Sequence, residues 1–396
     1  MAKNNKSLSR RDFFHMTAAG MTCLTLTGSS SGQEKVQEHA PDTKQPPKIQ
    51  TNVDEIKNIP KTGDSMPGKY PGKVVMLTAG SASSNGAING NKVSECLKKG
   101  MLALTGKSDL RSAWSEFVKP DDVVGIKVNP IGGKLLSTKP EVVDVIIQGV
   151  LAAGVPKERI IIWDRRMFQL AEAGFTAERF PGIEISGTEM EGPNGEFYTT
   201  EGELWSLENI DREYTPYFAD IEGKYDKETL PYMINEGKYS YFTKILTQKC
   251  TRIINVPILK NAGAAVTLCL KNLSYGSLSN TSRLHRLWNE SVAEPCAFPC
   301  LRDKVSLNIV DGLQACYDGG PGANPKFIWD ANIMMIGTDP VAVDTIGYKY
   351  IIKERMERGV QQLEDKRRRA FLENAENLSL GTCQEDKIDL HEIDMA

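Results

Sequence analysis

The segment from Ile253 to Leu273 reads IINVPILKNAGAAVTLCLKNL, and this stretch predicts both the fold and a site. A β-branched apolar run ends at Lys260, a turn of small residues follows, and a second apolar run leads to Lys271 and Asn272. Short apolar runs bounded by such turns are typical of buried strands. Because ligands bind outside the carboxyl ends of strands in parallel α/β sheets, we expect these polar side chains to line a binding site.

The segments around this stretch alternate between apolar runs and amphipathic patterns. We expect strands at 73–78, 123–129, 159–164, 305–311 and 332–337, helices at 91–104, 110–117, 138–153, 281–291 and from 340 onward, and an edge strand at 387–393. Strands that alternate with helices through short connections form right-handed βαβ units and a parallel sheet. The sequence therefore predicts an α/β fold with a mainly parallel sheet flanked by helices.

The N-terminal residues resemble a twin-arginine export signal. The sequence SRRDFF at 9–14 precedes a mildly hydrophobic stretch at 16–27 that ends in small residues. That stretch is too short and too polar for a membrane span, which needs about 20 apolar residues. We interpret residues 1–31 as a signal peptide, with the twin-arginine translocase as partner during export and a periplasmic or extracellular location afterwards. No stable membrane span is expected after cleavage.

The remaining chain divides by composition into a linker and one large domain. Residues 32–72 are polar and rich in Pro and Lys, which predicts a disordered linker. Residues 73–396 form the α/β domain. Within it, residues 187–240 are acidic and aromatic, interrupt the strand and helix rhythm, and are interpreted as an insertion. Its aromatic side chains either contact a ligand as a lid or pack the insertion onto its own domain.

Overall charge gives no reason to expect a nucleic-acid partner. The chain has 396 residues, of which 25% are charged, and a formal net charge of −3. A sequence pI near 6.0 agrees with this balance. Nucleic-acid-binding domains usually carry a basic patch or a high pI, so we expect a small molecule as the ligand instead.

Lysine and asparagine side chains at the predicted strand ends form the candidate site. Lys127 and Asn129 share a face at the end of one strand because side chains alternate along it. Ammonium groups offer point charges for a carboxylate or phosphate, and crowding lowers the pKa of at least one lysine, which then becomes a base or a Schiff-base former. The candidate catalytic residues are Lys260, Lys271 and Lys127, and the candidate ligand-binding residues are Asn129, Asn272, Asp164, Asp311 and Asp344.

Two further readings of the polar residues stay open. Together with Asp339, the aspartates of the candidate site offer oxygen ligands for a divalent cation, although Asp339 also suits a helix N-cap. In an exported protein Cys296 and Cys300 predict a disulfide, with two free thiols or a metal or redox role as alternatives. The cofactor is therefore unknown from the residues.

Several of these blocks together resemble a known family, domain-of-unknown-function family 362 (DUF362). The likeness rests on the Lys-x-Asn at 127–129, the segment 139–164, NVPILK at 255–260, TLCLKNL at 267–273 and DPVAVD at 339–344. It extends over about 73–353. The resemblance implies an iron-sulfur role in some members, but this chain lacks their Cys-x-x-Cys-x-x-Cys run, so a cluster is not expected. A fainter similarity to the lactate racemase family, in which a lysine holds a nickel-pincer nucleotide, is an analogy.

Three functions follow as hypotheses. The first is an exported enzyme that binds a small anionic ligand at the lysine-rich strand ends. The second is a metal-associated or redox-associated accessory protein, suggested by the export signal and the cysteines. The third is a non-enzymatic periplasmic binding protein, suggested by the aromatic insertion.

Overall fold

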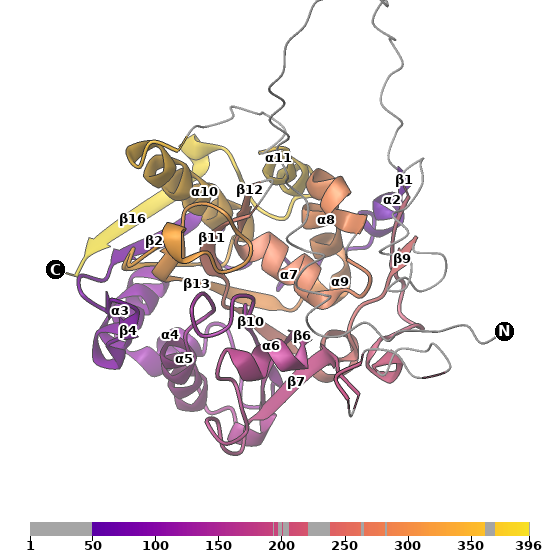
Figure 1. The fold of residues 1–396 in the computed structure, drawn as a ribbon, viewed down its shortest axis with the longest axis horizontal. Helices are drawn as coiled ribbons and strands as arrows, with labels where there is room; N and C mark the ends of the chain where they lie inside the picture. The colour runs from indigo at the N-terminus through magenta and orange to yellow at the C-terminus, as the bar shows by residue number, and fades with distance from the viewer. Residues whose placement is uncertain are drawn as a thin grey trace, which may run out of the picture.

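The protein is an α/β domain with a large, mostly parallel sheet between two layers of helices (Figure 1). The computed structural model describes residues 50–192, 194–196, 200, 206–220, 238–262, 265–281, 283–360 and 369–395. The expected signal peptide and residues 32–49 lie outside this range. The predicted fold class is confirmed.

The central sheet contains eight strands in one continuous path. Their order is β16 (Asp389–Asp394), β2 (Lys73–Thr78), β15 (Ile333–Gly337), β13 (Val305–Cys316), β10 (Arg252–Asn255), β5 (Val124–Lys127), β6 (Ile160–Arg166) and β7 (Glu184–Glu189). Along this path β15 runs antiparallel to both of its neighbours, and the remaining pairs are parallel.

Shorter strands extend the sheet or form small sheets of their own. β11 (Ile258–Ala262) pairs with β13 and with β12 (Ala265–Thr267), and β14 (Ile328–Trp329) also pairs with β13. β3 (Ser83–Ser84) and β4 (Ala87–Ile88) form a hairpin. β1 (Gln50–Thr51), β8 (Tyr217–Asp220) and β9 (Tyr239–Ser240) form a three-stranded sheet.

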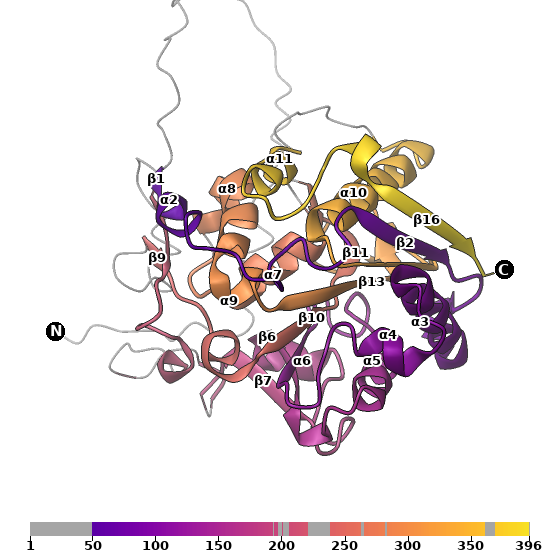
Figure 2. The ribbon, with the colours of Figure 1, turned by 180° about the vertical axis from the view of Figure 1, so that it is seen from behind.

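Helices cover both faces of the sheet, as the front and back views show (Figure 2). The α-helices are α2 (Val53–Ile56), α3 (Gly90–Thr105), α4 (Leu110–Trp114), α5 (Pro140–Ala152), α6 (Met167–Glu172), α7 (Cys269–Ser277), α8 (Trp288–Ala293), α9 (Pro299–Arg302), α10 (Pro340–Glu357) and α11 (Ala370–Asn377). Short turns of other helix types lie at 157–159, 207–209, 245–249, 283–287, 294–297, 325–327 and 385–387.

Two apolar cores lie on opposite faces of the sheet because successive strand side chains point to opposite sides. In β2, Val74 belongs to one core, whereas Val75 and Leu77 belong to the other. Burial on both faces explains why the strands read as nearly continuous apolar runs.

The second apolar run of the opening stretch was predicted wrongly. It was expected to continue as a strand to Lys271, but a helix, α7, begins at Cys269. The Asp344 side chain accepts hydrogen bonds from the backbone N–H groups of Cys269 and Leu270 at 2.6 and 3.0 Å. A carboxylate at a helix N-terminus favours the helix. This carboxylate comes from α10, 75 residues after Cys269 in the chain. The pattern of a short apolar run cannot distinguish a buried helix from a buried strand, and it does not reveal a distant capping carboxylate.

The helix expected at 138–153 begins at Pro140, with Lys139 at its N-cap position. Thr138 precedes this helix and has another role. The Thr138 hydroxyl accepts a hydrogen bond from the Asn129 backbone N–H and donates one to the Val256 carbonyl. It therefore ties the segments after β5 and β10 together. The predicted Asp339 cap of α10 is confirmed, since its side chain accepts from two backbone N–H groups of the first turn.

The end of the expected linker is packed on the domain. Met66 is fully buried, and the buried Arg302 side chain donates to the carbonyls of Ile59 and Pro60 at 3.0 and 2.9 Å. From residue 50 onward the structure therefore differs from the predicted disorder. A polar, proline-rich segment is ordered here because a side chain from α9 satisfies its backbone carbonyls.

The described part of the insertion packs against its own domain. The Tyr214 ring lies edge-on to Phe242 at 5.7 Å, and the Tyr217 ring lies edge-on to Phe298 at 6.1 Å. These contacts agree with the packing interpretation of the insertion aromatics. The Phe218 and Tyr239 rings contact each other at 5.2 Å, and Tyr198, Trp205, Tyr225 and Tyr232 lie outside the described residues.

Candidate functional site

The candidate site lies at the point where the strand order reverses. From β5 the chain moves to β6 and β7 on one side, and then returns to β10 on the other side of β5. Such a switch point leaves a crevice outside the carboxyl ends of the two strands, which is the usual ligand site in open α/β sheets. Lys127 ends β5 and Asn255 ends β10, and the two residues are paired in the sheet register.

Lys127 is held in a buried ion pair. Its Nζ contacts Asp164 Oδ1 of β6 and donates to the Val128 carbonyl at 2.8 Å. Burial lowers the pKa of Lys127, and the charge of Asp164 opposes that shift. Gly276 of α7 makes this arrangement possible, since a Cβ there would overlap the end of the Lys127 side chain. Lys127 and Asp164 are thus brought together as predicted, but each neutralises the other.

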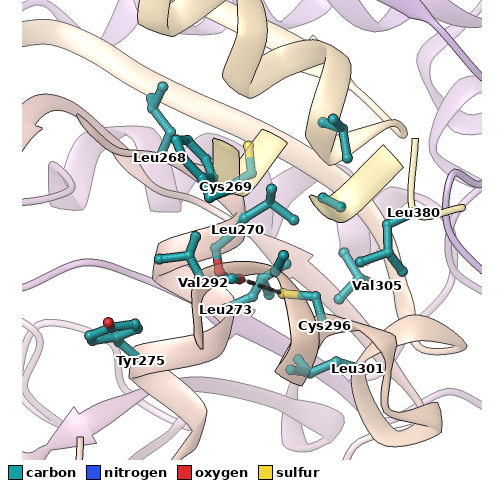
Figure 3. Close-up of a cluster of buried hydrophobic side chains, with 14 of the residues drawn as sticks. Leu268, Cys269, Leu270, Leu273, Tyr275, Val292, Cys296, Leu301, Val305 and Leu380 are labelled. Atoms are coloured by element: carbon teal, nitrogen blue, oxygen red, sulfur yellow. Dashed lines mark hydrogen bonds between the residues drawn. The ribbon is translucent and has the colours of Figure 1, made fainter. Parts of the chain in front are cut away.

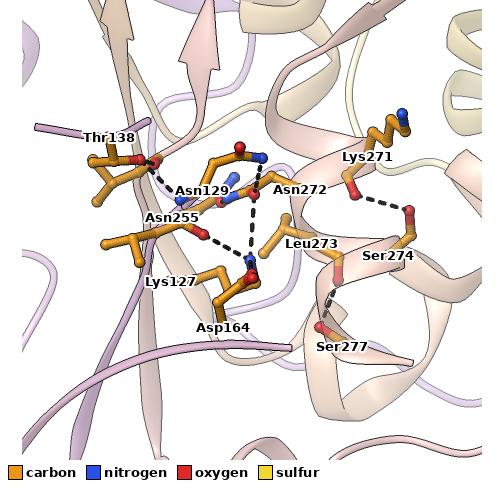
Figure 4. Close-up of polar contacts among 12 residues, drawn as sticks. Lys127, Asn129, Thr138, Asp164, Asn255, Lys271, Asn272, Leu273, Ser274 and Ser277 are labelled. Atoms are coloured by element: carbon orange, nitrogen blue, oxygen red, sulfur yellow. Dashed lines mark hydrogen bonds and ion pairs between the residues drawn. The ribbon is translucent and has the colours of Figure 1, made fainter. Parts of the chain in front are cut away.

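A chain of four asparagine side chains crosses the strand ends, and Figure 4 shows three of them, Asn129, Asn272 and Asn255. Asn129 Nδ2 donates to Asn272 Oδ1 at 3.0 Å, and Asn272 Nδ2 donates to Asn255 Oδ1 at 2.8 Å. Asn255 Nδ2 then donates to Asn308 Oδ1 at 2.9 Å, and Asn308 donates to the carbonyls of 337 and 338. Every amide therefore has a fixed orientation. Asn255 and Asn308 were missed in the sequence, although both lie on strands at the level of the predicted site.

Lys260 donates a hydrogen bond to the first asparagine of this series, Asn129. Its Nζ donates to Asn129 Oδ1 and to the Ile131 carbonyl, both at 2.9 Å. The side chain is fully buried and has no carboxylate partner among the described residues. Burial lowers the pKa of Lys260 to about 7, with a further contribution from the charge of Lys271. Lys260 is therefore a lysine that changes charge near neutral pH.

Lys271 occupies an aromatic environment on another side of α7. Its Nζ lies 4.6 Å from the Trp288 ring centroid and 5.4 Å from that of Tyr275. Its hydrogen-bond contact within the described residues is a long one, 3.5 Å to the Thr267 hydroxyl. Burial lowers the pKa of Lys271 to about 7. Figure 4 shows its side chain pointing away from Asn272 and Lys127, so Lys271 does not join the asparagine chain.

Comparison with known proteins finds a family similarity in part of this site. Residues 219–349 match the family model described as Domain of unknown function (DUF362). The matched segment contains Lys260, Lys271 and three of the four asparagines, whereas Lys127 and Asn129 precede it. The predicted resemblance is thus supported over 219–349, which is part of the 73–353 expected.

Two further comparisons were made, with solved structures and with curated proteins. A crystal structure of a Thermotoga maritima protein, a target of the Northeast Structural Genomics Consortium, is similar with 9% sequence identity and a TM-score of 0.34. The match covers 69% of this chain and 60% of that protein. A search of curated proteins finds no match.

The three other predicted carboxylates, Asp311, Asp339 and Asp344, accept hydrogen bonds from backbone N–H groups at the starts of helices. Asp311 Oδ2 accepts from the Lys139 backbone N–H at the start of α5, at 2.8 Å, while Asp339 and Asp344 cap α10 and α7. Burial raises the pKa of Asp344 to about 7 and that of Asp311 to about 6, against the hydrogen bonds that each accepts. The structure therefore places Asp311 and Asp344 as helix caps and does not bring them together with Asp164.

The predicted disulfide between Cys296 and Cys300 is not formed. The described part of the chain contains seven cysteines, and each is a buried free thiol. The Cys296 thiol points toward the Leu270 and Val292 carbonyls at 3.6 and 3.7 Å, inside an apolar cluster (Figure 3). Cys296 lies in the helical turn at 294–297, before α9, and Cys300 lies within α9, so the two thiols belong to different local elements.

Three further findings concern metal ligands, a cavity and membrane spans in the described residues. Within the described ranges, no group of three or more His, Cys, Asp or Glu side chains is arranged to hold a metal ion. A cavity of about 330 Å³ lies beside the insertion and is lined by Asp211, Glu213, Lys244 and Gln248 among others. None of the helices in the described part of the chain combines the length and apolarity that a bilayer crossing requires.

Proposed function

We propose that this protein is an exported enzyme that binds a small carboxylate or phosphate at Lys260 and Lys271. The observation that carries the proposal is that both lysines are buried and lack a carboxylate partner among the described residues. A buried ammonium without a counter-charge is costly, and most buried lysines are paired. An anionic ligand supplies the missing counter-charge.

The position of Lys260 supports the same proposal. Lys260 is linked through Asn129 to the loop after β5, at the switch point of the sheet. A lysine whose pKa lies near 7 serves as a general base or a nucleophile at neutral pH. Perturbed pKa values in a crevice are typical of catalytic sites. In this proposal Lys260 is the catalytic residue and Lys271 holds the ligand charge.

Lys127 has a positioning role in this proposal. Its charge is already balanced by Asp164, and its Nζ lies 3.3 Å from Asn272 Oδ1. It therefore fixes the amide of Asn272, which in turn orients Asn129 beside Lys260. Such support holds a catalytic group in one geometry.

Isothermal titration calorimetry with acetate, lactate, pyruvate and inorganic phosphate tests the binding part of the proposal. We expect Lys260→Met and Lys271→Met each to weaken binding at least about tenfold, because a lost charge-assisted hydrogen bond or ion pair is worth about 1.5–3 kcal/mol. Lys304→Met is the matched control, since Lys304 is a partly buried lysine that donates to the Leu246 carbonyl instead. Equal affinity in all three variants would show that the anion binds elsewhere.

The same titrations separate an enzyme from a binding protein. Turnover of a bound compound, measured by mass spectrometry of the products, is expected for the wild type and lost in Lys260→Met. Tight binding with no product from any bound compound would favour the non-enzymatic binding protein.

The export part of the proposal rests on the arginine pair and the mild hydrophobic stretch at 16–27. A double change, Arg10→Lys with Arg11→Lys, keeps the charge and is expected to retain the full-length precursor in the cytoplasm of a host with a twin-arginine translocase. Cell fractionation measures this. Unchanged export of the double variant would contradict the twin-arginine assignment.

A further inference from the structure

The hydrogen bonds of Lys260 match an uncharged amine. Its Nζ has two acceptors among the described residues, Asn129 Oδ1 and the Ile131 carbonyl. An ammonium has three N–H donors, so one would be left without a partner in a fully buried position. A neutral amine has two N–H donors and one lone pair. Both donors are then satisfied, and the lone pair is free to react.

Lys271 has the opposite environment. Its Nζ faces the rings of Trp288 and Tyr275, and cation–π contacts of this kind stabilise the charged form. Its charge also disfavours a second charge on Lys260. The two lysines therefore divide the roles, with a cation at Lys271 and an amine at Lys260.

Lys260 lies between a partly exposed loop and a small apolar cluster. The Ile131 carbonyl, which accepts from Lys260, belongs to a loop in which Gly132 and Gly133 adopt positive φ angles of 111° and 57°. Leu136, which follows this loop, packs with Ile258 and Cys316 in a small apolar cluster that is separate from the two main cores. Cys316 is also the register partner of Lys260 in the sheet. The amine is thus one hydrogen bond away from a partly exposed loop and lies beside a small apolar wall.

We propose that the ligand is a small 2-oxo acid and that Lys260 forms an imine with its carbonyl carbon. This inference rests on the proposed function, since Lys271 supplies the charge for the carboxylate. The amine lone pair forms the C–N bond, and one amine proton moves to the carbonyl oxygen to give a carbinolamine. The C–O bond then breaks, and the oxygen leaves as water with the second amine proton. No other reactant is required for this step.

Borohydride trapping with pyruvate tests the imine. Protein comprising residues 32–396 is incubated with pyruvate at about pH 7, where Lys271 still carries charge, reduced with sodium borohydride, digested and mapped by mass spectrometry. We expect one carboxyethyl group on Lys260. An ordinary lysine is neutral in roughly a few ten-thousandths of molecules at that pH, so the label at Lys260 should exceed that on an exposed lysine by roughly two orders of magnitude.

Lactate, Lys260→Met and Lys304→Met are the controls. Lactate carries the same carboxylate without a carbonyl, so it should bind and leave no label. Lys260→Met should lose the label while its circular dichroism spectrum stays that of the folded protein, and Lys304→Met should keep the label. Anion binding that depends on Lys271 with no label on Lys260 would overturn the imine and leave the proposed function in place. A protein that binds neither pyruvate nor lactate would overturn both.

Discussion

The Nζ of Lys260 lies 2.9 Å from Asn129 Oδ1, and this contact joins a lysine of β11 to the segment that follows β5. The two residues are 131 positions apart in the chain. The contact begins a line of amides that ends at the carbonyls after β15, so the carboxyl ends of the central strands form one connected polar layer. A network whose members all have partners holds its side chains in one geometry.

Removal of the Lys271 amine should change how stability depends on pH. Burial lowers the pKa of Lys271 to about 7 in the folded protein, whereas an unfolded lysine has a pKa of about 10.4. Between these values the unfolded state binds more protons, so the wild type gains stability as pH rises. Lys271→Met should therefore be more stable than wild type below about pH 7, by on the order of 4 kcal/mol at most, and lose this advantage towards pH 10.

Urea unfolding between about pH 6 and pH 10 measures this difference, within the range where the protein refolds reversibly. Lys353→Met is the control, because the Lys353 side chain is 72% exposed. A parallel pH dependence in wild type and Lys271→Met would show that Lys271 keeps an ordinary pKa in the folded protein.

Substitution of Asn255 by Leu should strongly destabilise the fold. Asn255 accepts from Asn272 and donates to Asn308 Oδ1 and the Cys269 carbonyl, so leucine leaves three buried groups without that partner. Unsatisfied buried groups cost about 1–3 kcal/mol each, which predicts a loss of roughly 3–5 kcal/mol in the free energy of unfolding. The control is Asn58→Leu at an exposed position, expected within about 0.5 kcal/mol of wild type. A loss below about 1 kcal/mol for Asn255→Leu would mean that the amide chain contributes little.

Alanine at position 276 should disturb the site through Lys127. A Cβ on Gly276 would overlap Cε and Nζ of Lys127, whose position is fixed by Asp164. We expect Gly276→Ala to lower the free energy of unfolding by about 1–3 kcal/mol. We also expect weaker anion binding, because a displaced Lys127 side chain would move its Nζ away from Asn272 Oδ1. Gly90→Ala is the control, since nothing lies within 4 Å of its added Cβ. Equal stability and equal anion affinity in the two variants would contradict the close packing of α7 on Lys127.

The cysteines of the described residues should behave as buried thiols. Burial raises the pKa of Cys250 and Cys300 to about 12, which suppresses the reactive thiolate. We expect a slow reaction of native protein comprising residues 32–396 with Ellman's reagent and a rapid reaction of its seven thiols after denaturation. A cross-linked Cys296–Cys300 peptide in a non-reducing digest would restore the disulfide predicted from the sequence.

Much of the fold follows from local patterns in the sequence. The apolar runs at 73–78, 159–164 and 332–337 become β2, β6 and β15, and the alternating C-terminal segment becomes the edge strand β16. Strands that are buried on both sheet faces have nearly continuous apolar sequences, which can be recognised locally. The start of α10 at Asp339 and Pro340 is also a local pattern, because Pro favours the first position of a helix. Lys127 and Asn129 were found because they end or follow β5, whereas Lys260, expected at a strand end, lies in the middle of β11.

The tertiary structure decided which of these side chains meet. The helical state of Lys271 depends on a carboxylate from α10, the order of residues 50–72 depends on Arg302, and the charge of Lys127 is balanced by Asp164 on the neighbouring strand. Asn255 and Asn308 join the site because their strands pair in one register. Each of these relations is a contact between segments distant in the chain. The local sequence sets which side chains a strand end carries, and the sheet order sets which partners those side chains meet.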